Sequence, residues 1–184
     1  MDILLTGQET EEHLVVGKSV ALVKNTQELK NATSTLVLAT TPDRTLLEGP
    51  IDGVLFTDTK GKDHIHYRRG ILDEVSAKIL AKDNKALIIP INTLLNEKNV
   101  PRALGRAHQD ARLATTHGAP TLFVSMGENY TPTTHDLEAT ARALGFPEKT
   151  VAKNQQAILA WVERARHRAS DEYIAEGISK TKGI

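Results

Sequence analysis

Short runs of aliphatic and β-branched residues alternate along this chain with longer stretches whose apolar residues recur at helical spacing. Such alternation is typical of a mostly parallel sheet whose strands are joined by crossover helices. Buried parallel strands are predicted over residues 14–16, 20–23, 36–39, 53–56, 86–89 and 121–124, with 64–66 as a weaker candidate. The pattern predicts an α/β fold, either an open doubly wound sheet or a small TIM-like (β/α) barrel that need not be complete.

Helices are predicted in the intervening stretches from periodicity and from end signals. Pro101 can open one of them at its first turn, and His117 with Gly118 can close it. In the last helix Trp161 lies on an apolar stripe, which indicates core packing rather than contact with a cofactor. The predicted helices cover residues 26–32 and 42–47, run from Leu72 to near Asn84, from Pro101 to His117 and from the TPTTHD segment to Gly145, and include residues 158–165.

Length and composition limit the organisation of the chain. A sequence of 184 residues with 40% apolar content can bury one sizeable core. We therefore predict a single β/α barrel domain over residues 1–168 and a polar tail over 169–184, which we expect to fray or to dock on a partner.

The sequence has no run of eighteen apolar residues and no signal-peptide pattern, so we expect no membrane association and a cytoplasmic location. The lack of cysteine excludes disulfides, thiolate nucleophiles and cysteine-ligated zinc.

Charge directs attention to one segment. The 23 basic and 23 acidic residues balance, so a nucleic-acid partner would have to be bound by a local basic patch. The stretch DHIHYRRG, residues 63–70, ends a predicted strand and carries two adjacent arginines, Arg68 and Arg69. Guanidinium groups bind phosphates bidentately, and His66 or Tyr67 could stack on an unpaired base. More basic residues are predicted on the outer faces of the helices: Lys78, Lys82, Arg102, Arg106, Arg112, Lys149 and Lys153.

The same stretch allows a different chemistry. Residues two apart on a strand point to one face, so His64 and His66 could both reach one metal ion, with Asp63 or Asp58 completing the site. No second cluster of histidines or carboxylates follows a later predicted strand, which disfavours this interpretation. A metal-dependent hydrolase using His64 and His66 remains the alternative, and a small-molecule binding module would require a deep pocket at the strand ends.

Four passages follow one another in a fixed order from about Val15 to about Trp161. They are SVALVKNTQELKNAT, HYRRGILDEVSAKILAKDNKALIIPINTLLN, RAHQDARLATTHGAPTLFVSMG and TPTTHDLEATARALGF. In the first, a strand with a lysine precedes a short helix; in the second, basic residues precede a glycine, a helix and a strand. Together, these passages resemble the archaeal ribonuclease P protein component 3 family, which is related to the eukaryotic 30-kDa ribonuclease P subunit.

The resemblance implies a barrel of the polymerase-and-histidinol-phosphatase type without its metal site. It implies an accessory RNA-binding subunit of ribonuclease P, the endonuclease that removes the 5′ leader from precursor tRNA. The catalytic RNA would hold magnesium and perform the chemistry, while this chain would bind no cofactor, pair with a small ferredoxin-like subunit and meet precursor tRNA only indirectly. Which RNA element is contacted and how many copies assemble are left open. The implied RNA contacts are Arg68, Arg69, Lys78, Arg106 and Arg112, with His66, Tyr67, Lys24 and His135 as further candidates.

Overall fold

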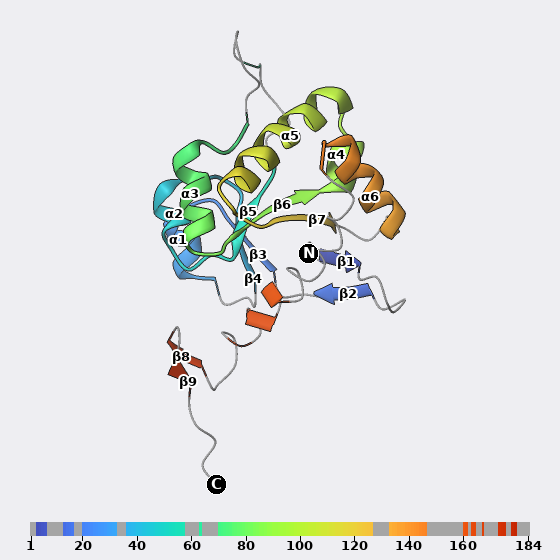
Figure 1. Ribbon diagram of the computed structural model, residues 1–184. Coiled ribbons are helices and arrows are strands. Elements are labelled where there is room, and N and C mark those ends of the chain that lie inside the picture. Colours follow the sequence, from blue (N-terminus) through green and yellow to red (C-terminus); the bar gives the residue numbers. More distant parts are fainter. Residues whose placement is uncertain are drawn as a thin grey trace.

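A curved, mostly parallel sheet forms the centre of the protein in the computed structural model (Figure 1). Its strand order is β2-β1-β7-β6-β5-β4-β3. The strands are β1 (Ile3–Thr6), β2 (His13–Val16), β3 (Val20–Val23), β4 (Leu36–Ala39), β5 (Gly53–Leu55), β6 (Ala86–Pro90) and β7 (Thr121–Met126). The structure describes residues 3–6, 13–16, 20–32, 36–57, 63, 70–126, 133–146, 160–161, 163–164, 167, 173–175 and 178–179.

The helices follow the strands in alternation, as the sequence predicts. They are α1 (Thr26–Lys30), α2 (Arg44–Leu47), α3 (Glu74–Lys82), α4 (Ile91–Leu95), α5 (Val100–Thr116) and α6 (Thr134–Ala143). Side chains cap several of them; the Asp73 carboxylate, for example, accepts from the backbone N–H of Ser76 at 2.7 Å at the start of α3. Two predicted stops are also found, since Asn84 follows α3 with φ of 51° and Gly145 follows α6 with φ of 78°.

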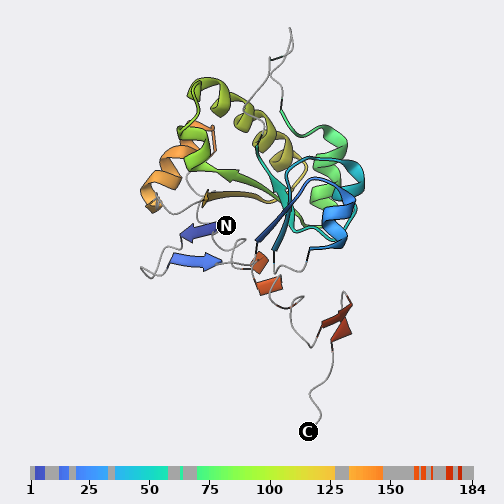
Figure 2. The ribbon, with the colours of Figure 1, turned by 180° about the vertical axis from the view of Figure 1, so that it is seen from behind.

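The winding of the chain distinguishes between the two predicted architectures. Strands β3 to β7 pair in parallel with their neighbours in chain order. When each new strand is added on the same side of the preceding one, right-handed crossovers place every connecting helix on one face of the sheet. In a doubly wound sheet the order of strand addition reverses partway along the chain, so helices cover both faces. The fold is therefore α/β with barrel-like winding, and Figure 2 shows the sheet from behind, with β2 and β3 at its two edges among the described strands.

Each central strand buries residues on both of its faces. Along β4, Val37 and Ala39 belong to the larger core cluster, while Leu36 and Leu38 belong to the smaller one. The larger cluster also contains buried residues of α2 to α6, whereas the smaller contains strand residues and Trp161. Trp161 is 4% exposed, and its indole N–H donates to the backbone carbonyl of Asp52 at 2.9 Å. The prediction that Trp161 packs in the core is thus confirmed, and it covers the face of the sheet opposite the helices.

The N-terminal strands differ from the prediction. Residues 14–16 are predicted to be a parallel strand, but β2 runs antiparallel to β1, which is itself antiparallel to β7. β1 itself was not predicted. A short apolar run carries no information on the direction of its neighbour, because strand direction depends on the pairing partner rather than on the residues of the strand.

Other short elements are also missed. Helix α4 has five residues and no side-chain cap, so it lacks the periodicity and the start signal on which a prediction depends. Within the predicted polar tail, β8 (Tyr173–Ala175) pairs antiparallel with β9 (Ile178–Ser179). The weaker strand candidate at 64–66 lies outside the described residues, and the single-domain boundary at 168 stays a prediction.

Candidate nucleic-acid interface

Two anchors on helix α5 hold the chain on either side of the basic segment, residues 64–69. The segment contains His64, His66, Tyr67, Arg68 and Arg69, all of which lie outside the described residues. Asp63 immediately precedes it and Gly70 immediately follows it, and both are described. The structure therefore describes the contacts of the residues on either side of the basic segment.

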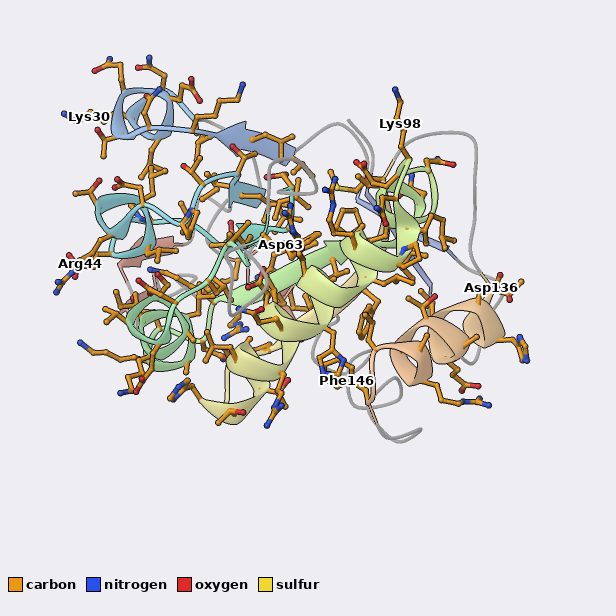
Figure 3. All side chains as sticks on the ribbon, turned by 90° about the horizontal axis from the view of Figure 1, so that it is seen from above. Lys30, Arg44, Asp63, Lys98, Asp136 and Phe146 are labelled. Carbon is orange, nitrogen blue, oxygen red and sulfur yellow. The ribbon has the colours of Figure 1, made fainter. Side chains whose placement is uncertain are left out.

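The first anchor is an ion pair between Arg106 of α5 and Asp63. The Nε–H of Arg106 donates to Oδ1 of Asp63 at 2.8 Å. The arginine side chain is fully buried, while that of Asp63 is 31% exposed. Figure 3, which looks onto the helices from above, labels Asp63 beside α5. A buried guanidinium needs a close anionic partner to offset its lost hydration, so this pair fixes the position of Asp63.

The second anchor is Asp110, one helical turn after Arg106. Its carboxylate accepts from the backbone N–H of Ile71 at 2.8 Å and from that of Leu72 at 3.1 Å, one bond to each oxygen. Asp110 is fully buried. Hydrogen bonds to a carboxylate are stronger than those between neutral groups, so the backbone at 71–72 is firmly attached to α5.

Gly70 meets a steric requirement of this second anchor. A Cβ atom built at position 70 would lie 2.1 Å from Oδ1 of Asp110. Such a distance is well below van der Waals contact, so any side chain larger than hydrogen would displace the carboxylate that holds Ile71 and Leu72. The glycine that follows the basic segment therefore has a packing reason to be there.

Helix α3 begins directly after this attachment. Hydrogen bonds from the backbone and side chain of Ser76 lower the pKa of the capping Asp73 below its ordinary value of 3.8. In the next turn Lys78 is exposed and donates to Glu74 at 2.6 Å, and this bond, with the lysine charge, lowers the pKa of Glu74. Lys78 is thus accessible from solvent, although it already pairs with the Glu74 carboxylate. Because such an exposed ion pair is weak, a phosphate group could take the place of the carboxylate.

The remaining predicted contacts are spread over the surface. Lys24 is exposed at the end of β3, and His135 is exposed in the first turn of α6. Arg112 is exposed on α5, where it lines a groove with Leu104, Leu113 and Ala143. Lys24, Arg112 and His135 thus come from three separate elements of the fold.

The predicted surface position of Arg106 is wrong. Its side chain is 0% exposed, so it cannot present its guanidinium to RNA in this arrangement. Its guanidinium pairs with Asp63, and Ala103 and Ala107 of the same helix are buried as well. Asp110 is a further site residue that was not predicted; the only signal for it in the sequence is its spacing of four residues from Arg106, on the same helix face.

The described part of the chain contains no complete metal site of its own. There, no three histidine, cysteine, aspartate or glutamate side chains lie close enough to hold a metal ion. His64 and His66 are outside this part, so their proposed ligation stays a prediction.

None of the helices in the described residues is long and apolar enough to cross a membrane.

No protein-family model matches the sequence, and no curated protein matches it significantly. The fold is similar to a chain in the cryo-EM structure of archaeal ribonuclease P with mature tRNA, with a TM-score of 0.69. The match covers 89% of this chain and 74% of that chain at 16% sequence identity. At this level of identity the likeness establishes a shared fold.

Proposed function

We propose that this protein is an accessory RNA-binding subunit of ribonuclease P, which supports removal of the 5′ leader from precursor tRNA by the catalytic RNA. The observation that carries the proposal is the fold shared with a chain of an archaeal ribonuclease P complex over 89% of this protein. The order of four sequence passages that resemble the component 3 family supports the same assignment independently of the fold.

The proposed mechanism is electrostatic. A folded RNA brings phosphates close together, and cations that neutralise them stabilise the compact form. The net charge of zero supplies no general attraction, so binding would depend on local groups, foremost Arg68 and Arg69. Lys78 and Arg112 are exposed and could add peripheral contacts. Arg106 is buried against Asp63, and we therefore remove it from the set of direct phosphate contacts.

The proposal extends to the rest of the complex. Catalysis and magnesium would belong to the RNA, so this chain would supply no catalytic residue. A small ferredoxin-like protein would be its protein partner, and precursor tRNA would be met through the assembled enzyme. A ribonucleoprotein that matures tRNA in an archaeal-type cell would act in the cytoplasm.

Binding to the catalytic RNA of an archaeal ribonuclease P, measured across a salt titration, tests the proposal. Replacing both Arg68 and Arg69 by alanine should weaken binding and reduce the slope of log K against log salt by about 0.7 to 0.9 for each phosphate that is no longer neutralised. A matched control removes two charges elsewhere, with Lys30→Ala and Arg44→Ala on α1 and α2, which Figure 3 places on the flank away from Asp136. Equal slopes for the wild type and the Arg68/Arg69 variant would reject the proposed contact.

A further inference from the structure

We propose that a groove along helix α5, where α6 lies beside it, binds an unpaired nucleotide of the RNA (Figure 3). The inference rests on the proposed function, because it adds a second RNA contact to the same protein. The groove has a volume of about 730 Å³, which is within the range of sites that bind small organic groups.

The groove is elongated, because its lining follows one face of a helix. It extends along α5 from Pro101 to Thr116, and Ala143 of α6 adds to its wall. At 1.5 Å per residue this stretch of helix is roughly 22 Å long. A surface of this length suits a segment of a polymer better than a compact small molecule.

Part of the wall is apolar and already fixed in position. Leu104 and Leu113 are half-buried, and both pack against the larger core cluster. The flat face of a nucleobase is hidden by stacking in a duplex and becomes available when the base is unpaired. Such a face can lie against these leucines without first ordering them, so the contact loses little conformational entropy.

His108 adds an aromatic ring that is also held in place. Gly145, just after α6, has φ of 78°, and a Cβ atom built on it would lie 3.0 Å from Cε1 of His108. The imidazole therefore packs against the backbone that follows α6, where a side chain on Gly145 would crowd it. A ring fixed between two helices is suited to stacking on an unpaired base.

The charge of the groove matches an anion. Arg112 follows His108 by four residues, so the two side chains lie on one face of α5, about 6 Å apart along its axis. Arg112 is exposed, and among the described residues no carboxylate forms an ion pair with it. The described lining also contains no aspartate or glutamate. A phosphate at Arg112 would thus meet a guanidinium without repulsion from the lining.

The apolar wall and the cation together identify the occupant. An unpaired nucleotide carries a flat base next to an anionic phosphate, whereas a base-paired nucleotide exposes the phosphate but not the face of the base. The lining offers a partner to each part, with Leu104, Leu113 and His108 for the base and Arg112 for the phosphate.

Two pairs of variants test the groove. Ala143→Glu puts a carboxylate into the lining, and Ala139→Glu makes the same change one turn earlier on α6, outside the lining. Both alanines are exposed, so neither substitution crowds the core. Arg112→Ala removes the cation, and its control, Arg44→Ala, removes an exposed arginine of α2. Circular dichroism and thermal unfolding check that each variant is folded.

Two RNAs serve as probes, and affinity for each is measured across a salt titration. They are the catalytic RNA of an archaeal ribonuclease P and a short single-stranded RNA of mixed sequence, compared with the same sequence as a duplex. We expect Ala143→Glu to weaken binding of both probes by roughly tenfold, the effect of losing one stacked base. Arg112→Ala should reduce the slope of log K against log salt by about 0.7 to 0.9, the effect of one phosphate. The two controls should bind like the wild type, and duplex binding should be insensitive to Ala143→Glu.

Each of the other outcomes has a definite meaning. If Ala143→Glu binds both RNAs as well as Ala139→Glu does, or if Arg112→Ala leaves the salt slope unchanged, the inference is wrong, while the proposed function is unaffected. Loss of association with the small ferredoxin-like subunit in Ala143→Glu, with RNA binding intact, would make the groove a protein-docking site instead. If the single strand binds through the groove and the catalytic RNA does not bind at all, the proposed function fails and the nucleotide site stands. Binding of neither RNA would reject both.

Discussion

Nε of Arg106 and Oδ1 of Asp63 lie 2.8 Å apart, although the residues are separated by 43 positions in the chain. The arginine is fully buried and the aspartate is 31% exposed, so the two partners differ in how much they depend on each other. Loss of the aspartate leaves a buried cation with one fewer acceptor. Loss of the arginine leaves a carboxylate that water can reach.

The first prediction follows from this difference. Asp63→Asn should lower the free energy of unfolding by about 2 kcal/mol, because it removes a charged hydrogen bond from a buried guanidinium. The exposed pair of Lys78 and Glu74 provides the control, since Glu74→Gln should be nearly neutral. Urea denaturation of both variants measures the difference, and similar costs would contradict the burial of Arg106.

The second prediction concerns Trp161, the single tryptophan of the chain. Trp161→Phe should lower the free energy of unfolding by about 1 kcal/mol, because the carbonyl of Asp52 loses the indole N–H while still accepting from Ala86. Trp161→Ala should cost about 3 to 5 kcal/mol, since it also opens a cavity beside the sheet. Thermal and urea unfolding followed by circular dichroism measure both values, and a negligible effect of the alanine variant would show that this face is not covered as described.

The third prediction concerns Lys85, whose ammonium group donates to the carbonyl of Gly49 at 3.0 Å and to Asp83 at 2.9 Å. It also donates to the carbonyl of Leu47 at the end of α2. Lys85→Met should lower the free energy of unfolding by about 1 to 3 kcal/mol, because these acceptors lose their donor. The matched change Lys82→Met, at an exposed position of α3, should be nearly neutral. Equal effects of the two substitutions in urea denaturation would argue against this contact.

The fourth prediction is a pH dependence at the start of α3. Hydrogen bonds from Ser76 lower the pKa of Asp73 below 3.8 in the folded protein, so this carboxylate stabilises the fold fully above the unfolded pKa. Its contribution is lost as the pH falls through the lowered folded pKa. Asp73→Ala should therefore cost about 1 kcal/mol near neutral pH, and the difference from the wild type should shrink in acid. A difference that stays constant down to about pH 2 would contradict the capping role.

Local signals are sufficient to predict the framework of the fold. The apolar run of β4 and the stripe of α5 with Pro101 in its first turn carry their own periodicity and end signals, and both elements appear where expected. β1 and α4 are too short for such signals, and the antiparallel direction of β2 depends on its partner. Distinguishing barrel-like winding from a doubly wound sheet requires the order of the strands in the sheet. The sequence of a single segment does not contain that order.

The candidate site is predictable only in part. The basic residues of DHIHYRRG are visible in the sequence, but the residues that hold its ends are not. Arginines are mostly exposed, so the sequence favours a surface position for Arg106, whereas its burial depends on the distant Asp63. Asp110 likewise acquires its role from backbone groups at 71–72 that only the fold brings near.

Reconstitution tests the central claim most directly. The chain is added to the catalytic RNA of an archaeal ribonuclease P, with and without the small ferredoxin-like subunit, and cleavage of precursor tRNA at the 5′ leader is measured at limiting magnesium. The proposed function predicts that cleavage rises when the chain is present, and that the Arg68→Ala, Arg69→Ala variant gives a smaller rise that declines more gently with salt. Unchanged cleavage in both mixtures would contradict it.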